Sequence, residues 1–343
     1  MTVVVKLGSS LVVGPGGRVR RSVLRVRGRE IGRIVAGGEQ VCVVSSGAIA
    51  LGLPRLGLDR RPRSIAQLQA ASALGQARLQ AAWDAALAPL QAAQVLLTAA
   101  DVGDRTTYVN ARSALASLLK LGAVPVVNEN DATATDEITF GDNDALAAQV
   151  AVLLRARLLV LLTEVDGVYS RAPGTPGAEL LSEGRDAGEA VLGAASPLGR
   201  GGMRSKVLAA ELAAAAGIPT VIAAGTGASV LEPILAGEQR GTRFAAAERS
   251  ESAFKLWLRF GKPVCGRITV DAGARRALVE EGASLLGVGV VGCDGAFEPG
   301  DAVELVGPDG AVFAKGIASV PAGELGGRRR GVEAVHRDRL VVF

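Results

Sequence analysis

The chain has 343 residues, of which 49% are hydrophobic and 21% are charged. This composition can bury a sizeable core and excludes a chain that is disordered throughout, and the length suits a large domain with a smaller one. No run of about 18 uncharged apolar residues occurs, and Lys6 and Gly8 interrupt the apolar start. We therefore expect neither a membrane-spanning helix nor a signal peptide, and a cytoplasmic location.

The charge and the rare residue types limit the chemistry further. The net charge is +4 and the pI about 9.2, with arginine supplying nearly all of the positive charge. This leaves a nucleic-acid partner open without requiring one. Cys42, Cys265 and Cys293 lack the C-x-x-C spacing of a zinc site or a disulfide framework. His336 is the one histidine, and its position is typical of a structural or surface residue, so we expect no Ser-His-Asp or Cys-His catalysis.

The first part of the chain, up to about residue 248, alternates apolar runs with alanine- and leucine-rich stretches. The apolar runs predict strands at Val3–Leu7, Val41–Ser45, Val95–Leu97, Val124–Asn128, Leu158–Leu162 and Thr220–Ala223. The other stretches predict helices at Ser64–Leu87, Tyr108–Leu121, Asp144–Leu154 and Ser205–Ala216. Continuous apolar strands are typical of strands buried on both faces. We therefore expect an α/β domain over residues 1–248, with a mostly parallel open sheet between helices.

The residue composition of the chain changes after a junction that we expect at residues 249–262. Residues 263–343 contain short β-like runs separated by Gly and Asp turns, at Arg267–Val270, Gly287–Val291, Ala302–Val306, Ala311–Ile317 and Leu340–Phe343. A helix is predicted at Ala272–Glu281. This pattern indicates a small β-barrel-like domain.

Polar residues gather where the predicted strands of the first domain end. Lys6, Ser46, Asn128 and Thr163 lie at or just beyond such ends, where ligands bind in open sheets of this class. Two acidic-amide clusters follow, Asn128-Glu129-Asn130-Asp131 and Gly141-Asp142-Asn143-Asp144. Their side chains can bind a small polar ligand, cap a helix or orient a lysine.

A glycine-rich loop adds a candidate phosphate site. Residues 199–206 read Gly-Arg-Gly-Gly-Met-Arg-Ser-Lys and run into a predicted helix, an arrangement that presents backbone N–H groups to phosphate. The loop is neither a Walker A motif nor a dinucleotide-binding fingerprint, because both spacings are absent.

In their order and combination, these motifs resemble those of the glutamate 5-kinases, which are amino acid kinases with a C-terminal PUA domain. The kinase part of the resemblance lies in V-V-K-L-G-S-S at 4–10, S-S-G-A-I-A at 45–50, A-L-G-Q at 73–76, L-L-T at 96–98, N-E-N-D at 128–131, G-D-N-D at 141–144, V-D-G-V-Y at 165–169 and G-G-M-R-S-K at 201–206. The PUA part lies in G-R-I-T-V-D-x-G-A at 266–274 and V-H-R-D at 335–338. V-D-G-V-Y marks the wider superfamily, whereas N-E-N-D with G-D-N-D points to glutamate 5-kinases.

The resemblance implies ATP-dependent phosphorylation of the γ-carboxylate of L-glutamate to L-glutamyl 5-phosphate, the first step of proline biosynthesis. It implies catalytic roles for Lys6, Lys206 and Asp144, with the N–H groups of Gly8–Ser10 beside Lys6 on the phosphoryl group and Asp144 orienting the lysines. Glutamate would be bound by Ser46, Asp131 and Asn143, with Asp131 on its ammonium group. The nucleotide would be bound by Lys6, Thr163, Glu164, Arg200, Gly201, Gly202, Met203, Arg204, Ser205 and Lys206.

The resemblance also implies partners and leaves alternatives. Mg²⁺ would be carried with ATP, with no metal site made by the protein alone. Proline is expected as a feedback inhibitor, the chain as a homo-oligomer, and glutamyl-phosphate reductase as a partner, with no membrane. Glu164 and Arg200 stand where the family usually has Asp and Thr, and the PUA part is shorter than usual. An acetylglutamate kinase-like enzyme and an RNA-binding protein acting through its PUA domain are the alternatives.

Overall fold

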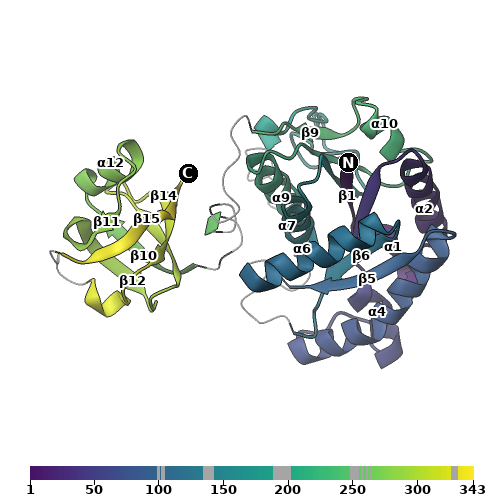
Figure 1. Ribbon diagram of the computed structural model, residues 1–343, viewed down its shortest axis with the longest axis horizontal. Coiled ribbons are helices and arrows are strands. Elements are labelled where there is room, and N and C mark those ends of the chain that lie inside the picture. The colour runs from purple at the N-terminus through teal and green to yellow at the C-terminus, as the bar shows by residue number, and fades with distance from the viewer. Residues whose placement is uncertain are drawn as a thin grey trace. The chain divides into compact units, whose positions relative to one another are not determined.

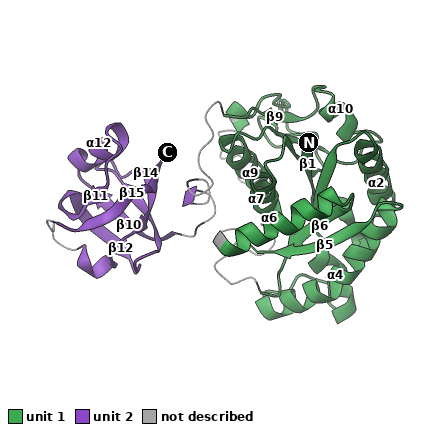
Figure 2. Cartoon of the chain, in the orientation of Figure 1, with its two compact units in different colours: residues 1–250 green, residues 251–343 purple. Residues whose placement is uncertain are grey.

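The computed structural model describes residues 1–98, 101, 105–133, 143–187, 202–247, 255, 258–259, 262, 264–325 and 331–343. The chain divides into two compact units, residues 1–250 and 251–343 (Figure 2). Most of the junction expected at residues 249–262 lies outside the described residues.

The first unit is built on a seven-stranded sheet of the order β5-β6-β4-β1-β7-β8-β9 (Figure 1). The strands are β1 (Thr2–Leu7), β4 (Gln40–Ser45), β5 (Ala92–Leu97), β6 (Val124–Glu129), β7 (Leu158–Thr163), β8 (Thr220–Ala224) and β9 (Thr242–Phe244). All neighbours pair in parallel except β8 with β9. The predicted α/β class with a mostly parallel sheet is confirmed. β1 lies at the centre, so its last residues meet the ends of β4 and β7.

Helices cover both faces of this sheet (Figure 1). They are α1 (Ser9–Val12), α2 (Arg21–Ala36), α3 (Ala48–Gly52), α4 (Ile65–Leu87), α6 (Arg105–Lys120), α7 (Asn143–Leu154), α9 (Met203–Ala215) and α10 (Leu231–Leu235). The sequence analysis did not predict α2, because six arginines between residues 20 and 33 make the segment polar on average, although its apolar residues follow a helical spacing. It also missed β9, whose three residues are too few for a visible period.

Alternation along β1 decides which side chains meet which helices. Val3, Val5 and Leu7 enter the core cluster that also contains side chains of α2 and α4. Val4 and Lys6 therefore point to the opposite face, where α7 packs against β1 and α9 packs against α7. A buried lysine at the end of a valine-rich strand thus faces the helix whose first turn carries Asp144.

The contact between α3 and α4 requires glycine. A Cβ atom on Gly75 would lie 1.8 Å from the carbonyl oxygen of Ala48, and one on Gly52 would lie 1.7 Å from that of Ala71. Both distances are far below van der Waals contact, so any larger residue would separate the helices. This packing fixes α4 beside the ends of β4 and β6.

The second unit is a six-stranded sheet of the order β11-β15-β14-β13-β10-β12. Its strands are β10 (Val264–Val270), β11 (Leu285–Leu286), β12 (Val290–Gly295), β13 (Ala302–Val306), β14 (Val312–Ala318) and β15 (Glu333–Val342), with helix α12 (Ala272–Glu280). Phe297, Phe313 and Leu305 lie in its core. The last strand is longer than the predicted Leu340–Phe343, because exposed charged residues at its middle interrupt the apolar pattern. Within the described parts of both units, no helix is long and apolar enough to cross a membrane.

Candidate active site

Two buried lysines meet one buried aspartate at the carboxyl end of β1. The Asp144 carboxylate pairs with the Lys6 ammonium through Oδ1 and with the Lys206 ammonium through Oδ2, the latter at 3.1 Å. The Ser205 hydroxyl also donates to Oδ2, at 2.7 Å. Lys6, Asp144 and Lys206 are 4%, 1% and 6% exposed. The structure thus brings together the three residues predicted to be catalytic, from β1, α7 and α9.

The charges of this cluster stabilise the ionised aspartate. Burial alone raises the pKa of Asp144, but the charges of Lys6 and Lys206, with hydrogen bonds from Lys6 and Ser205, lower it more strongly, so the net pKa lies below its ordinary value. Two buried ammonium groups thus lie around this carboxylate. Buried cations favour a negatively charged ligand such as a phosphoryl group.

Asp131 lies just beyond the end of β6, and its pKa is shifted in the opposite direction to that of Asp144. Its Oδ2 accepts a hydrogen bond from the Ser72 hydroxyl of α4, while its buried Oδ1 has no hydrogen-bond partner among the described residues. Burial raises the pKa of Asp131, against smaller lowering effects of the Ser72 hydroxyl and the charge of Arg61. A buried carboxylate oxygen without a donor is costly, so this atom is suited to accept a ligand's cation.

An amide network connects the end of β6 with α4 and α7. The Oδ1 atom of Asn143 accepts the Glu129 N–H at 3.3 Å, which leaves the Asn143 NH₂ group as a donor to a ligand. The Gln76 side chain donates to the Glu129 carbonyl at 3.2 Å and accepts from Asn128 Nδ2 at 3.1 Å. Asn143 and Asp144 are successive residues of α7. The first turn of this helix therefore contacts both the amide network and the lysine pair.

The end of β4 places Ser46 beside β1. The Ser46 N–H donates to the Leu7 carbonyl at 3.2 Å, and its side chain is buried. The neighbouring Ser45 hydroxyl accepts from the indole N–H of Trp83 at 2.9 Å. The turn after β1 differs from the expectation in one respect: the Gly8 N–H donates to the Leu162 carbonyl at 3.3 Å. That N–H already has an acceptor in the neighbouring strand β7.

The residues predicted for the nucleotide are only partly described. Thr163 ends β7, and its carbonyl accepts the Gly225 N–H at 2.7 Å. The exposed Glu164 side chain pairs with Arg20 at 3.3 Å. Gly202 precedes α9, whose first residues are Met203, Arg204, Ser205 and Lys206. Arg200 and Gly201 lie outside the described residues.

Sequence reasoning gave no role to Ser72 and Gln76. Both lie on α4 and bond to residues of the first acidic-amide cluster. Gln76 ends the motif A-L-G-Q, so the motif itself was a signal that this face of the helix meets a polar site. Ser72 lies in an alanine-rich helix, and a single serine there gives no such signal.

A buried lysine pair at the carboxyl edge of a parallel open sheet suits the binding and transfer of a phosphoryl group. The family model described as "Amino acid kinase family" matches residues 1–224, and the model described as "PUA domain" matches residues 266–337. The chain belongs to the amino acid kinase family.

Full-length relatives carry a more particular name. Proteins named glutamate 5-kinase are similar to this chain at 45% identity in Sphingopyxis alaskensis, 43% in Burkholderia ambifaria and 42% in Paraburkholderia xenovorans. Each match covers 99% of this chain and 97% of the relative. The resemblance drawn from the motifs is thus confirmed, as is the prediction of a kinase with a C-terminal PUA domain.

A solved structure supports the fold independently. A chain from a study titled "X-ray structures of isopentenyl phosphate kinase" matches with a TM-score of 0.50 at 22% identity. The match covers 71% of this chain and 100% of that chain. At this identity the similarity concerns the fold alone.

Proposed function

We propose that this protein transfers the γ-phosphoryl group of ATP to the γ-carboxylate of L-glutamate, giving L-glutamyl 5-phosphate for proline biosynthesis. The observation that carries the proposal is the first turn of α7. There, Asp144 binds the two buried lysines, while Asn143 accepts the N–H of Glu129, two residues before Asp131. One helix turn thereby supports a cationic subsite for phosphate and a polar subsite for an amino acid.

The chemistry needs positioning and charge more than a proton acceptor. A γ-carboxylate oxygen attacks the γ-phosphorus, the bond to the β–γ bridging oxygen breaks, and ADP leaves with that electron pair. The carboxylate is ionised at neutral pH, so no general base is required. In this proposal Lys6 neutralises the transferring phosphoryl group and Lys206 the leaving ADP. Fixed charges of this kind stabilise the transition state without reorganising.

On the amino acid side, Asp131 is the residue that distinguishes substrates. Its unpartnered Oδ1 suits the ammonium group of glutamate, and the Asn143 NH₂ group and Ser46 suit its carboxylates. An N-acetylated amino acid has no cation for Asp131. The geometry therefore supports glutamate over the acetylglutamate kinase-like alternative.

On the nucleotide side, we propose that Thr163, Glu164 and residues 200–206 surround ATP. Mg²⁺ would reach the site on the ATP phosphates, where it retains several waters. Both oxygens of Asp144 already accept from lysine or serine donors, so this carboxylate suits ordering of the lysines better than binding of the metal.

The remaining expectations stay predictions of this proposal. They are a cytoplasmic location, feedback inhibition by proline at the Asp131 subsite and the neighbouring loop from Leu53 to Ser64, and a homo-oligomeric enzyme. A contact with glutamyl-phosphate reductase and RNA binding through the PUA domain belong to the same group. The basic run considered for RNA, Arg328–Arg330, lies outside the described residues.

The test is a coupled assay of ADP release with L-glutamate, N-acetylglutamate, aspartate and UMP as acceptors. Hydroxylamine is included in parallel, because it traps an acyl phosphate as a hydroxamate and separates transfer from simple ATP hydrolysis. We expect ADP release and hydroxamate with glutamate alone. Equal or faster turnover of N-acetylglutamate would exclude the role proposed for Asp131 and the function with it.

A further inference from the structure

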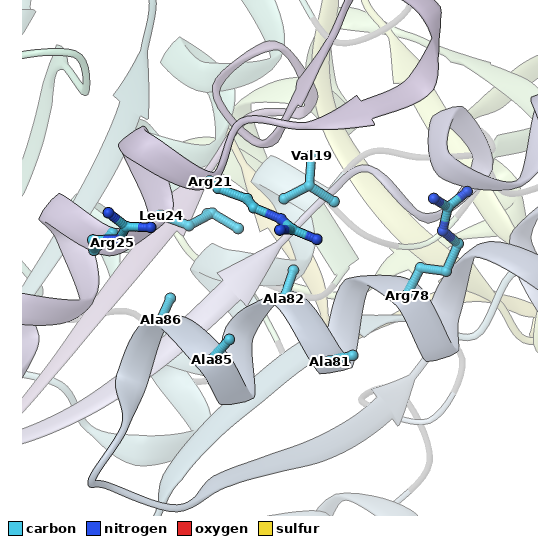
Figure 3. A pocket seen from close by; sticks show the side chains of 9 residues that line it. All are labelled: Val19, Arg21, Leu24, Arg25, Arg78, Ala81, Ala82, Ala85 and Ala86. Atoms are coloured by element: carbon cyan, nitrogen blue, oxygen red, sulfur yellow. The ribbon is translucent and has the colours of Figure 1, made fainter.

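A pocket of about 410 Å³ lies between α2 and α4, apart from the residues of the candidate active site (Figure 3). Its floor is a row of alanines on α4, and Arg21, Arg25 and Arg78 lie around it. Figure 3 shows the Arg21 side chain extended above the alanines, with Arg25 and Arg78 towards the two ends of the row. The volume falls in the range of small-molecule sites, about 300–1,000 Å³.

The arginines of this pocket lack the acidic partners that Arg27 and Arg33 of α2 have. Arg27 and Arg33 each pair with a glutamate at 2.6 Å. Within the described part of the chain, Arg21 and Arg25 have no ion pair, and Arg78 makes only a long hydrogen bond to a carbonyl, at 3.4 Å. No acidic residue is among those that line the pocket. The pocket therefore concentrates positive charge over an apolar surface.

The beginning of α2 adds to this charge. α2 has 16 residues, no side-chain cap at its N-terminus and no acidic residue in its first turn. The N-terminus of a helix carries a partial positive charge that is normally balanced by an acidic or capping side chain. Here Arg20 and Arg21 occupy these positions instead; Arg20 pairs with Glu164, which leaves the Arg21 cation beside the positive end of the helix. A bound anion would offset both the guanidinium charges and the helix dipole.

We propose that this pocket binds a small organic phosphate, with its phosphate group at the Arg21 guanidinium, its apolar part on the alanine row, and Arg25 and Arg78 adding positive charge from the two ends. Arginine suits such a ligand, because its planar N–H groups match phosphate oxygens in pairs. One phosphate ester carries nearly two negative charges on a single group, which the positive charge around this pocket favours over a single carboxylate. The alanines and Leu24 favour a ligand with a carbon body over the bare ion.

The test is calorimetric titration of the full chain, with the ATP site saturated by a non-hydrolysable ATP analogue. The probes are phenyl phosphate, inorganic phosphate and benzoate. We expect one phenyl phosphate per chain, bound more tightly than either other probe. The double variant Arg21→Gln and Arg25→Gln should weaken binding by about tenfold or more, since charge-assisted hydrogen bonds are lost. The matched control is Arg29→Gln, an exposed arginine of the same helix that does not line the pocket.

A second variant separates loss of the site from loss of the fold. Ala85 is exposed on the alanine row, and Ala85→Glu places a carboxylate among the arginines without disturbing the core. This variant should keep or raise the melting temperature while abolishing phenyl phosphate binding. Equal weakening by Arg29→Gln would mean general charge attraction and overturn the proposal. So would benzoate binding as tightly as phenyl phosphate, or no saturable binding to the wild-type chain.

Discussion

Replacing Asp144 by asparagine tests whether one carboxylate organises the lysine pair. The change keeps the size of the side chain and removes its charge. In the wild-type chain Asp144 accepts from both lysines and from Ser205, and its side chain is 1% exposed. The variant leaves two buried ammonium groups around a neutral amide. Breaking a buried ion pair in this way costs about 3–5 kcal/mol, a large part of a typical total stability of about 5–15 kcal/mol.

The effect of this change can be measured by thermal unfolding and by steady-state kinetics. For a unit of this size, about 2–4 °C of melting temperature is lost per kcal/mol, so thermal unfolding of the Asp144→Asn variant should shift down by roughly 10 °C. Its kcat should fall on the order of 10²-fold or more, because the lysines lose their preorganised positions. Inorganic phosphate should recover more of the melting temperature in the variant than in the wild type, since it supplies the missing negative charge.

The pH dependence gives an independent check with a definite sign. The pKa of Asp144 is lowered in the folded chain, so its stabilising contribution is present above the unfolded pKa of about 3.9. It is lost as the pH falls through the lower folded value. The difference in stability between wild type and variant should therefore be constant from about pH 8 to 5 and shrink below about pH 4.

The control is Asp84→Asn, an exposed aspartate of α4 that accepts a hydrogen bond from Gln80 at 3.1 Å. It should change neither the melting temperature nor kcat appreciably. If Asp144→Asn behaves like this control, the carboxylate does not organise the lysines, and the electrostatic argument for the site is wrong.

The remaining predictions concern each part of the proposed enzyme. Lys6→Ala and Lys206→Ala should each lower kcat on the order of 10²-fold while changing the KM for glutamate little; steady-state kinetics that show a near-normal kcat would remove that lysine from the mechanism. Asp131→Ala and Asn143→Ala should raise the KM for glutamate and leave that for ATP nearly unchanged, whereas a selective loss of ATP affinity would reverse the assignment of the two subsites. A chain truncated after residue 249 should remain folded by circular dichroism and retain phosphoryl transfer, and a folded but inactive truncation would give the PUA domain a role in the active site.

The fold was predictable from the sequence where burial leaves a simple pattern. β1, β4, β7 and β8 are continuous apolar runs because helices cover both of their faces. Helices rich in charged residues are harder to predict from their apolar pattern. α2 buries Leu24 and Ile31 but surrounds them with arginines, and it even buries Arg27 and Glu30 as a pair. Because the α2 segment is polar on average, the sequence analysis did not predict this helix.

The position of the candidate site was predictable from the strand ends, because parallel strands bring Lys6 and Ser46 to one edge of the sheet. The motifs added Asp144 and Lys206 as candidates. The expectation that Asp144 orients both lysines came from the resemblance alone, because this contact depends on how α7 and α9 pack, which no local pattern encodes. The engaged Gly8 N–H likewise depends on the neighbouring strand β7.

The two buried aspartates of the site are in opposite electrostatic states, and this difference bears on the order of events in the proposed reaction. Asp144 already has its cations, and its pKa is lowered. Asp131 has a hydroxyl on one oxygen and no described partner on the other, and its pKa is raised. Charged Asp131 therefore costs stability in the empty site, and that cost is offset when an ammonium group binds beside it. The free energy gained there depends on ionised Asp131, so glutamate affinity should weaken as the pH falls towards this raised pKa. The lysine pair needs no such ligand to be ordered. In the proposed reaction, the lysine pair is thus ordered before substrate arrives, whereas Asp131 has no cation at Oδ1 until an amino acid with a free ammonium group binds.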